Sequence, residues 1–353
     1  MKYNKILQED VQDLAKNSPI LKELKNVTIL VTGATGLIGG QCVFTLLELN
    51  HLFDANIEVV ALVRNLSKAE KIFHSFLEDE HLQLIEGDVL APVEIESNID
   101  YIIHGASSTD SVFFVQHPVD TIAVAVKGTE NLLELARKNR VRSMIYLSSL
   151  EVYGITNPNV DSISENDYGY LDPISVRSSY SEGKRIAECL CIAYLQQYQV
   201  PVRIARLSQT FGPGVDYKDK RVFAQFARSV IEGQDIILKT RGETVRNYCY
   251  TKDVVKALFY IMLEGQVGQA YNVANKDTAI SIREMAELVL KRNGNSCSHL
   301  IFDIAEDIEK LGYNPTMKIR LNTEKLEKLG WTAEVNLETM FDKLIQSMQI
   351  DRE

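Results

Sequence analysis

Residues 27–39 read VTILVTGATGLIG, and this stretch decides the fold. Its first five residues are an apolar run with β-branched side chains, which predicts a buried strand, and the glycines that follow open a helix. Gly33 permits the tight turn, Gly36 lets the backbone approach a pyrophosphate, and Gly39 allows close contact between helix and strand. The N–H groups at the start of this helix, around Thr35, Leu37 and Ile38, then face the phosphates. The pattern predicts a dinucleotide-binding turn.

Further strands and helices alternate on either side of this turn. Apolar runs predict strands at 57–63, 82–85, 101–103, 144–147 and 202–205, and longer periodic stretches predict helices at 37–49, 121–138 and 178–199. None of the strands alternates cleanly between apolar and polar residues, as expected when helices cover both faces of a parallel sheet. We therefore predict an α/β fold, a Rossmann-type doubly wound parallel sheet with a smaller mixed C-terminal substrate lobe.

The predicted division has three parts: an N-terminal helical extension over 1–26, a cofactor-binding domain over 27–207, and a substrate lobe over 208–353. The boundary near 207 rests on a change of texture, because the segment LSQTFGPGVDYKDKR is rich in Gly, Asp and Lys and reads as a loop. The chain is expected to cross between the two larger parts. No regular strand–helix series is expected beyond it.

Composition narrows the function. The 353 residues carry a net charge of −10, which argues against nucleic acid or an anionic membrane as a partner. No apolar run is long enough to span a bilayer, and the N-terminus lacks a signal-peptide pattern. Five scattered cysteines show no metal-ligand spacing, so we expect reduced thiols, no metal site and a cytoplasmic location.

The end of the second strand bears on the choice of cofactor. An acidic residue at this position accepts hydrogen bonds from the ribose 2′-hydroxyl of NAD, whereas an Arg accommodates the 2′-phosphate of NADP. Here the strand ends in Leu-Val and is followed by Arg64. The sequence therefore favours NADP(H), with NAD(H) as the alternative.

Four polar residues form a candidate catalytic set. Tyr180 and Lys184 are four residues apart on a predicted helix, so they share one face, and the Lys charge is expected to lower the pKa of the phenol. Such a phenol can exchange a proton with a hydroxyl that becomes a carbonyl. Ser149 and Glu151 follow a strand at the sheet edge where open α/β folds bind ligands, so Ser149 can contact the reacting oxygen and Glu151 can serve as an auxiliary acid or base.

These elements together resemble the extended short-chain dehydrogenase/reductase family of nucleotide-sugar epimerases, dehydratases and decarboxylases. The resemblance runs from about Val27 to beyond Asn272, and includes EGDV at 86–89, HGAS at 104–107, GTENLL at 128–133, RLSQTFGP at 206–213 and RNYCYTKD at 246–253. It implies that Asp88 contacts the adenine, that Val89, Ala106 and Ser107 also line the cofactor site, and that Lys184 orients the ribose. It further implies a substrate pocket for a nucleotide diphosphate that is lined by Gln209, Arg221, Arg246 and Tyr250.

The chain also departs from the family pattern. Dehydratases carry an Asp-Glu pair before Val-Tyr-Gly, but here Leu150 stands in the Asp position. Ala125 stands where the family usually has Asn. The pattern around Glu151 resembles instead the decarboxylase and pentose-rearranging branches.

These features give a ranked set of hypotheses. The first is an oxidoreductase or isomerase that acts on a nucleotide-activated sugar or polyol, with net consumption of NADPH as one form of it, and with a role in polysaccharide biosynthesis. The alternative is a redox-neutral epimerase or decarboxylase, similar to UDP-glucuronate decarboxylases, that recycles bound NAD. A non-catalytic scaffold and a reductase of small aldehydes or ketones rank lower. The resemblance also predicts a homodimer formed by the helices at 121–138 and 178–199, with an apolar stripe at Ile186, Leu190, Ala193 and Tyr194.

Overall fold

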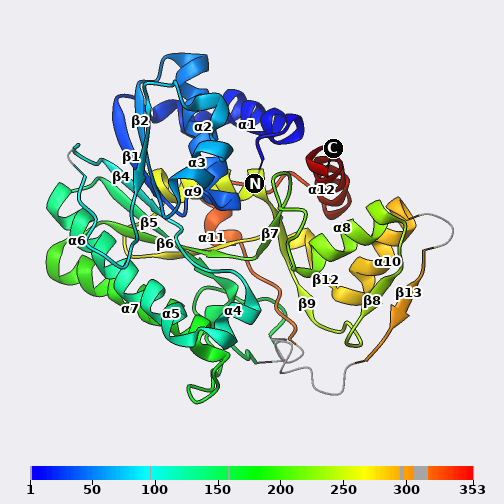
Figure 1. The fold of residues 1–353 in the computed structure, drawn as a ribbon. Coiled ribbons are helices and arrows are strands. Elements are labelled where there is room, and N and C mark those ends of the chain that lie inside the picture. Colours follow the sequence, from blue (N-terminus) through cyan, green and yellow to red (C-terminus); the bar gives the residue numbers. More distant parts are fainter. Residues whose placement is uncertain (1, 96, 158–159, 295–297, 305–316, 353) are drawn as a thin grey trace.

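The computed structural model describes residues 2–95, 97–157, 160–294, 298–304 and 317–352. Its main layer is a seven-stranded parallel sheet in the order β11-β6-β5-β4-β1-β2-β3 (Figure 1). The strands are β1 (Val27–Thr32), β2 (Ile57–Val63), β3 (Leu82–Glu86), β4 (Tyr101–His104), β5 (Ser143–Ser149), β6 (Val202–Leu207) and β11 (Ala270–Val273). The predicted doubly wound sheet is confirmed.

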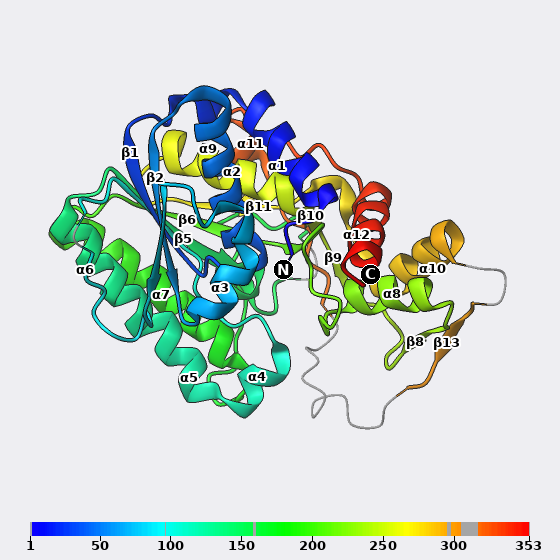
Figure 2. The same cartoon turned by 45° about the horizontal axis from the view of Figure 1, so that its top comes forward.

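Helices cover both faces of this sheet (Figure 2). One face packs against α1 (Lys5–Asn17), α2 (Leu37–Phe53), α3 (Leu66–Ile72) and α9 (Thr251–Glu264). The other face packs against α6 (Thr129–Asn139) and α7 (Ser178–Tyr198), and α5 (Pro118–Ala123) lies against α7. The inner strands are therefore buried on both sides, which explains why their sequences are mostly apolar and do not alternate with polar residues.

The smaller lobe has its own apolar core. It is built from β7 (Gln209–Phe211), α8 (Val222–Glu232), β8 (Ile236–Leu238), β9 (Val245–Arg246), β10 (Tyr248–Tyr250), β12 (Ile280–Ser281), α10 (Ile282–Asn293), β13 (Leu300–Phe302) and α12 (Leu337–Arg352). Between the elements of this lobe, α9 and β11 return to the main sheet, where β11 pairs with β6. The division at residue 207 stays a prediction, since the chain crosses back beyond it.

Short elements complete the chain: η1 (Pro19–Glu23), η2 (His74–Phe76), α4 (Ser111–Gln116), η4 (Leu150–Tyr153), η5 (Lys276–Thr278) and α11 (Glu324–Glu327). The predicted helix at 121–138 is not one regular helix, because a π-helical turn, η3 (Val124–Gly128), separates α5 from α6. This turn places Gly128 against Val89, where a Cβ atom on Gly128 would lie 2.9 Å from the Val89 side chain.

None of the helices in the described part of the chain combines the length and the apolar character that a membrane span requires.

Candidate active site

The glycine turn after β1 is shaped for close backbone approach. Gly33 has φ of 70°, and a Cβ atom there would lie 2.7 Å from the Gly105 carbonyl carbon. A Cβ atom on Gly39 would lie 2.4 Å from the Gly33 carbonyl oxygen. Helix α2 begins at Leu37 with Gly36 as its N-cap and no side-chain cap, so its first N–H groups are available to a phosphate. The residues present therefore fit the dinucleotide that the sequence predicts.

The other predicted cofactor residues lie along the same edge of the sheet. The Ala106 N–H donates to Thr32 Oγ1 at 3.2 Å, and this bond joins the ends of β1 and β4. Val89 is buried, whereas Asp88 is exposed and accepts a hydrogen bond from the Leu90 N–H at 3.0 Å. Arg64 is exposed immediately after β2. Ser107 is half-buried next to Ala106, and Thr35 and Ile38 are half-buried beside the glycine turn.

Tyr180, Ser149 and Lys184 come together between β5 and α7. The Tyr180 side chain is buried and forms a hydrogen bond with the Ser149 side chain. The Lys184 ammonium donates to the Leu147 carbonyl oxygen at 2.8 Å and lies 5.8 Å from the centre of the Tyr180 ring. The structure therefore groups the phenol, the hydroxyl and the ammonium as predicted, and their catalytic roles stay a prediction.

The proton affinity of this group differs from the expectation. Burial raises the pKa of Tyr180 above its usual value, and the negative charge of Glu151 raises it further. Nearby Arg177 and Arg221 lower this pKa, but by less than burial and Glu151 raise it. Burial lowers the pKa of Lys184 to about 8. The pKa of Tyr180 is therefore raised overall, whereas the sequence predicted a lowered pKa, because burial is the largest cause of the shift. A lowering contribution from Lys184 stays a prediction.

Glu151 forms an ion pair that sequence reasoning missed. Its carboxylate accepts from an Arg177 guanidinium nitrogen at 3.0 Å and from the Ser181 hydroxyl at 3.3 Å. Both partners belong to the N-terminal end of α7, where Arg177 precedes Tyr180 by three residues. That spacing places the Arg and the Tyr on one helix face and could have revealed Arg177 from the sequence.

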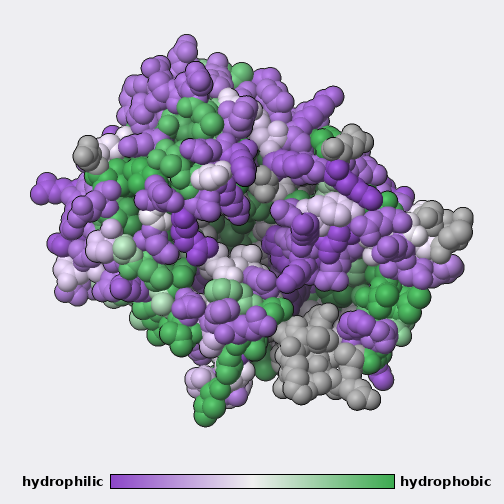
Figure 3. Space-filling model, viewed as in Figure 1, coloured by the Kyte–Doolittle hydropathy of each residue, from purple (hydrophilic) through white to green (hydrophobic). Residues whose placement is uncertain are grey.

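The predicted substrate residues fall into different settings. Arg221 caps α8, is half-buried, and pairs with Asp219 at 2.6 Å, yet its charge still reaches Tyr180. Arg246 on β9 is half-buried and has a buried Nε that meets no hydrogen-bond acceptor among the described residues. Gln209 is half-buried on β7. Figure 3 shows that the surface is hollowed between the larger lobe and the smaller lobe, and the smaller lobe carries these three residues.

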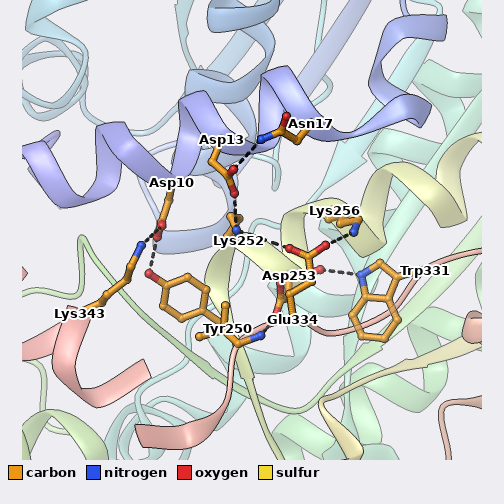
Figure 4. Close-up of polar contacts among 11 residues, drawn as sticks. Asp10, Asp13, Asn17, Tyr250, Lys252, Asp253, Lys256, Trp331, Glu334 and Lys343 are labelled. Atoms are coloured by element: carbon orange, nitrogen blue, oxygen red, sulfur yellow. Dashed lines mark hydrogen bonds and ion pairs between the residues drawn. The ribbon is translucent and has the colours of Figure 1, made fainter. Parts of the chain in front are cut away.

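Tyr250 does not join this site. Its hydroxyl donates to the buried carboxylate of Asp10 on α1, and the same carboxylate accepts from Lys343 of α12 at 2.6 Å (Figure 4). Tyr250 is fully buried in this contact. The structure therefore does not bring the Tyr250 hydroxyl to this site, because the N-terminal helix covers it, and a role of Tyr250 in substrate binding stays a prediction. The sequence gives no local signal for a contact between residues so far apart.

No group of three or more potential metal ligands occurs among the described residues. The structure describes four cysteines, and all four are free thiols: Cys42, Cys189, Cys191 and Cys249. Cys297, the fifth cysteine, lies outside the described residues.

This combination of a glycine turn, a Tyr-x-x-x-Lys helix and a parallel sheet defines an enzyme of the extended short-chain dehydrogenase/reductase type. A model of the NAD dependent epimerase/dehydratase family matches residues 29–274, and the chain belongs to that family.

Curated relatives extend the similarity over nearly the whole chain. UDP-glucuronic acid decarboxylase 1 of Xenopus tropicalis is 30% identical over 346 residues, which cover 96% of this chain and 78% of the relative. UDP-glucuronic acid decarboxylase 1 of Arabidopsis thaliana is 33% identical over 329 residues, which cover 92% of this chain and 70% of the relative.

The fold is also similar to solved structures. UDP-glucuronic acid 4-epimerase from Bacillus cereus, solved with UDP-glucuronic acid and NAD, superposes with a TM-score of 0.74 at 19% identity. The match covers 92% of this chain and 99% of that one. At this level of identity the likeness supports the fold.

Proposed function

We propose that the protein is a redox-neutral decarboxylase of UDP-glucuronate. The relatives named above favour this reading over a net reduction by NADPH. One observation in the site carries the proposal: Glu151 is the only acidic residue of the Leu150–Tyr153 turn, and Leu150 is buried in an apolar cluster instead of offering a second acid. Elimination of water from a hexose needs an acid at that place, whereas loss of CO2 does not.

The chemistry follows from the position of the carboxylate in the substrate. Oxidation of the hydroxyl on sugar carbon 4 makes a ketone that is β to the carboxylate, and such an acid loses CO2 readily. The bonding electrons stay behind as an enolate, which takes a proton at carbon 5 before the ketone is reduced again. A bound nicotinamide supplies the acceptor for the hydride and returns it.

The protein's own groups handle the protons and the charge. Tyr180 takes the proton of the reacting hydroxyl and gives it back, while the Ser149 side chain holds the same oxygen. Lys184 orients the cofactor ribose. Glu151 lies near enough to Tyr180 for its charge to raise the pKa of the phenol, and we assign it to the proton at carbon 5.

Two arginines are suited to the anionic parts of this substrate. The buried Nε of Arg246 has no acceptor among the described residues, and a buried donor without an acceptor is costly unless a ligand supplies one. Arg221 adds a second fork beside Tyr180, and its charge is shared with Asp219. We assign both to the nucleotide diphosphate, together with Gln209.

The test is a direct product assay. The protein is incubated with UDP-glucuronate and a catalytic amount of NAD⁺ or NADP⁺, and CO2 and the nucleotide-linked pentose are quantified. We expect product in excess of cofactor with no net change in nicotinamide absorbance. Tyr180→Phe should reduce the rate at least about 100-fold without loss of cofactor binding. Stoichiometric consumption of NADPH would favour the reductive reading, and no CO2 from the wild type would refute the proposal.

We further propose that the adenosine pocket favours NADP(H). Arg64 is exposed at the end of β2, and the side chain of its neighbour Asn65 is engaged as the N-cap of α3, accepting from the Lys68 N–H at 2.7 Å. NAD(H) is the alternative, since the Bacillus cereus epimerase was solved with NAD. If Arg64→Asp leaves the ratio of NADP⁺ to NAD⁺ affinity unchanged, the argument fails.

We also propose a homodimer through α5 and α7. Exposed apolar side chains lie on these adjacent helices: Val119 is 77% exposed, Ile122 is 44% and Ile186 is 52%. Green side chains gather at the lower left of Figure 3, where Figure 1 places these helices. Tyr194, by contrast, is buried in the subunit and cannot serve the interface as predicted. Light scattering of the wild type should give twice the subunit mass, and Ile186→Asp should give the mass of a single subunit.

A further inference from the structure

Arg177, Phe114 and Tyr180 form a three-membered stack beside the proposed reaction centre. The Phe114 and Tyr180 rings are parallel to within 11°, with centroids 4.2 Å apart. The Arg177 guanidinium lies over the Phe114 ring, with its carbon 5.1 Å from the centroid of that ring. Phe114 is 2% exposed, so the stack is closed to water on the side of the ring.

The stack is anchored from two elements. Phe114 belongs to the short helix α4, and its carbonyl oxygen accepts from the Ser179 hydroxyl of α7 at 3.1 Å. Arg177 is the N-cap residue of α7, and Tyr180 lies in the first turn of this helix. The ring of Phe114 therefore fixes the plane of the Tyr180 ring, and a phenol held in one plane presents its proton in one direction.

The guanidinium is bonded in an unusual way. One of its nitrogens holds the Glu151 carboxylate at 3.0 Å, and the side chain is only 15% exposed. Its Nε and other terminal nitrogen are buried and meet no acceptor among the described residues. A guanidinium that served only to brace the fold would satisfy these donors with carbonyl oxygens, as Arg185 does with those of Val152 and Gly169.

We propose, on the basis of the function proposed above, that Arg177 is a positioning residue that acts on both proton-transfer groups. It holds the Glu151 carboxylate in place. Its positive charge acts on Tyr180 across the Phe114 ring and favours the phenolate form of Tyr180. Phe114 is the spacer that keeps the guanidinium close to Tyr180 without a direct bond between them. Because the path between the two groups is dry, the charge is poorly screened.

The variants separate charge from packing. Arg177→Met removes the charge, Arg177→Lys keeps it, and Phe114→Leu keeps an apolar spacer without a ring. Arg137→Met is the matched control, because Arg137 has the same two kinds of contact as Arg177. It pairs with a carboxylate, that of Glu134 at 2.8 Å, and its guanidinium carbon lies 5.2 Å from the centre of an aromatic ring, that of Tyr198. That pair sits on α6 and touches none of the residues proposed to react.

The first measurement needs no substrate. Protein labelled with ¹³Cζ-tyrosine is saturated with NAD⁺ and titrated by NMR, and the resonance of Tyr180 is identified by its absence in Tyr180→Phe. In Arg177→Met the midpoint should move to higher pH by about half a unit to one unit. It should stay near the wild-type value in Arg177→Lys and in Arg137→Met. A midpoint unchanged in Arg177→Met overturns the proposal.

The second measurement uses UDP-glucuronate. Arg177→Met should lower kcat by about 10- to 100-fold with KM changed less than about threefold. The variant misplaces the Glu151 carboxylate, whereas the bound substrate keeps its position. Arg177→Lys should restore part of the rate, and Phe114→Leu should lower kcat and broaden the pH profile. A change in KM alone, or full activity in Arg177→Met, overturns the proposal. If the wild type releases no CO2, the proposed function fails, and the NMR titration still decides the role of Arg177.

Discussion

Replacing Glu188 by Gln should be among the most destabilising conservative changes in this chain. Glu188 on α7 accepts from Arg206 of β6 through both oxygens, at 3.0 Å from Nε and 2.6 Å from a terminal nitrogen. The two side chains are 8% and 2% exposed. Ser148 donates a further hydrogen bond to the same carboxylate at 2.6 Å. Glutamine keeps the shape but leaves the Arg206 charge buried without a counter-charge.

The magnitude follows from that uncompensated charge. Removing one partner of a buried ion pair costs about 3 to 5 kcal/mol, and the low exposure of both side chains leaves little room for water to compensate. Arg206 also donates to the Tyr153 hydroxyl at 3.1 Å and to the Glu165 carbonyl at 2.7 Å, which partly hold it in place. We therefore expect the lower half of that range.

The assay is urea unfolding, followed by circular dichroism and by the fluorescence of Trp331, the only tryptophan. Glu182→Gln is the control on the same helix: Glu182 pairs with Arg185 at 4.0 Å with both side chains partly exposed, so its loss should cost less than about 1 kcal/mol. Equal destabilisation by the two variants would refute the reasoning. It would mean that Arg206 finds enough neutral acceptors.

Three further perturbations test other contacts. Tyr250→Phe should cost about 1 to 3 kcal/mol in unfolding free energy through loss of the hydrogen bond to buried Asp10, and leave kcat unchanged; a change in KM for substrate would return Tyr250 to the site. Lys184 has a pKa of about 8 when folded against 10.5 for an ordinary Lys, so between these values the unfolded chain holds more protons and stability should rise with pH. The unfolding free energy of Lys184→Met, compared with the wild type at pH 8 and pH 10, should lack this rise; parallel pH dependence contradicts it. Gly33→Ala should abolish cofactor binding, because φ of 70° and the 2.7 Å approach to the Gly105 carbonyl carbon admit no side chain; calorimetry with NAD⁺ and NADP⁺ that shows normal affinity would contradict this.

The inner strands of the main sheet were predictable because their side chains are buried on both faces and their sequences are mostly apolar. The edge strand β11 was not predicted, because it follows the smaller lobe's first elements in the chain and only folding returns it to β6. The glycine turn was predictable because its tight backbone contacts at Gly33 and Gly39 leave no space for a Cβ atom, so only glycine fits these positions. The predicted helix at 121–138 was less accurate. Its π-helical turn depends on contacts of Gly128 with Val89 and of Gly183 with Ala125, where a Cβ on Gly183 would lie 3.1 Å from that of Ala125. These are tertiary contacts that no local pattern contains.

The site divides in the same way. Tyr180 and Lys184 were predictable because their partnership is local to one helix. The sign of the pKa shift of Tyr180 was not, because it depends on how completely β5, α4 and α7 exclude water. The contact of Tyr250 with the N-terminal helix was not predictable for a related reason: its neighbour Asp10 lies 240 positions away in the chain, and only folding brings the two together.

Helix α7 explains how buried chemistry and a proposed interface coexist. Arg177, Tyr180, Lys184 and Glu188 follow one another at spacings of three and four residues, so they form a single stripe on the helix. The stripe runs from the ion pair with Glu151, through the phenol and the ammonium, to the bond with β6. Ile186 lies off this stripe and is exposed. A subunit interface on that side would press the helix toward the sheet, so each proton-transfer group would gain rigidity from contacts that it does not itself make. Loss of the dimer in Ile186→Asp should therefore lower kcat more than it raises KM, and this split separates support of the site from direct participation in it.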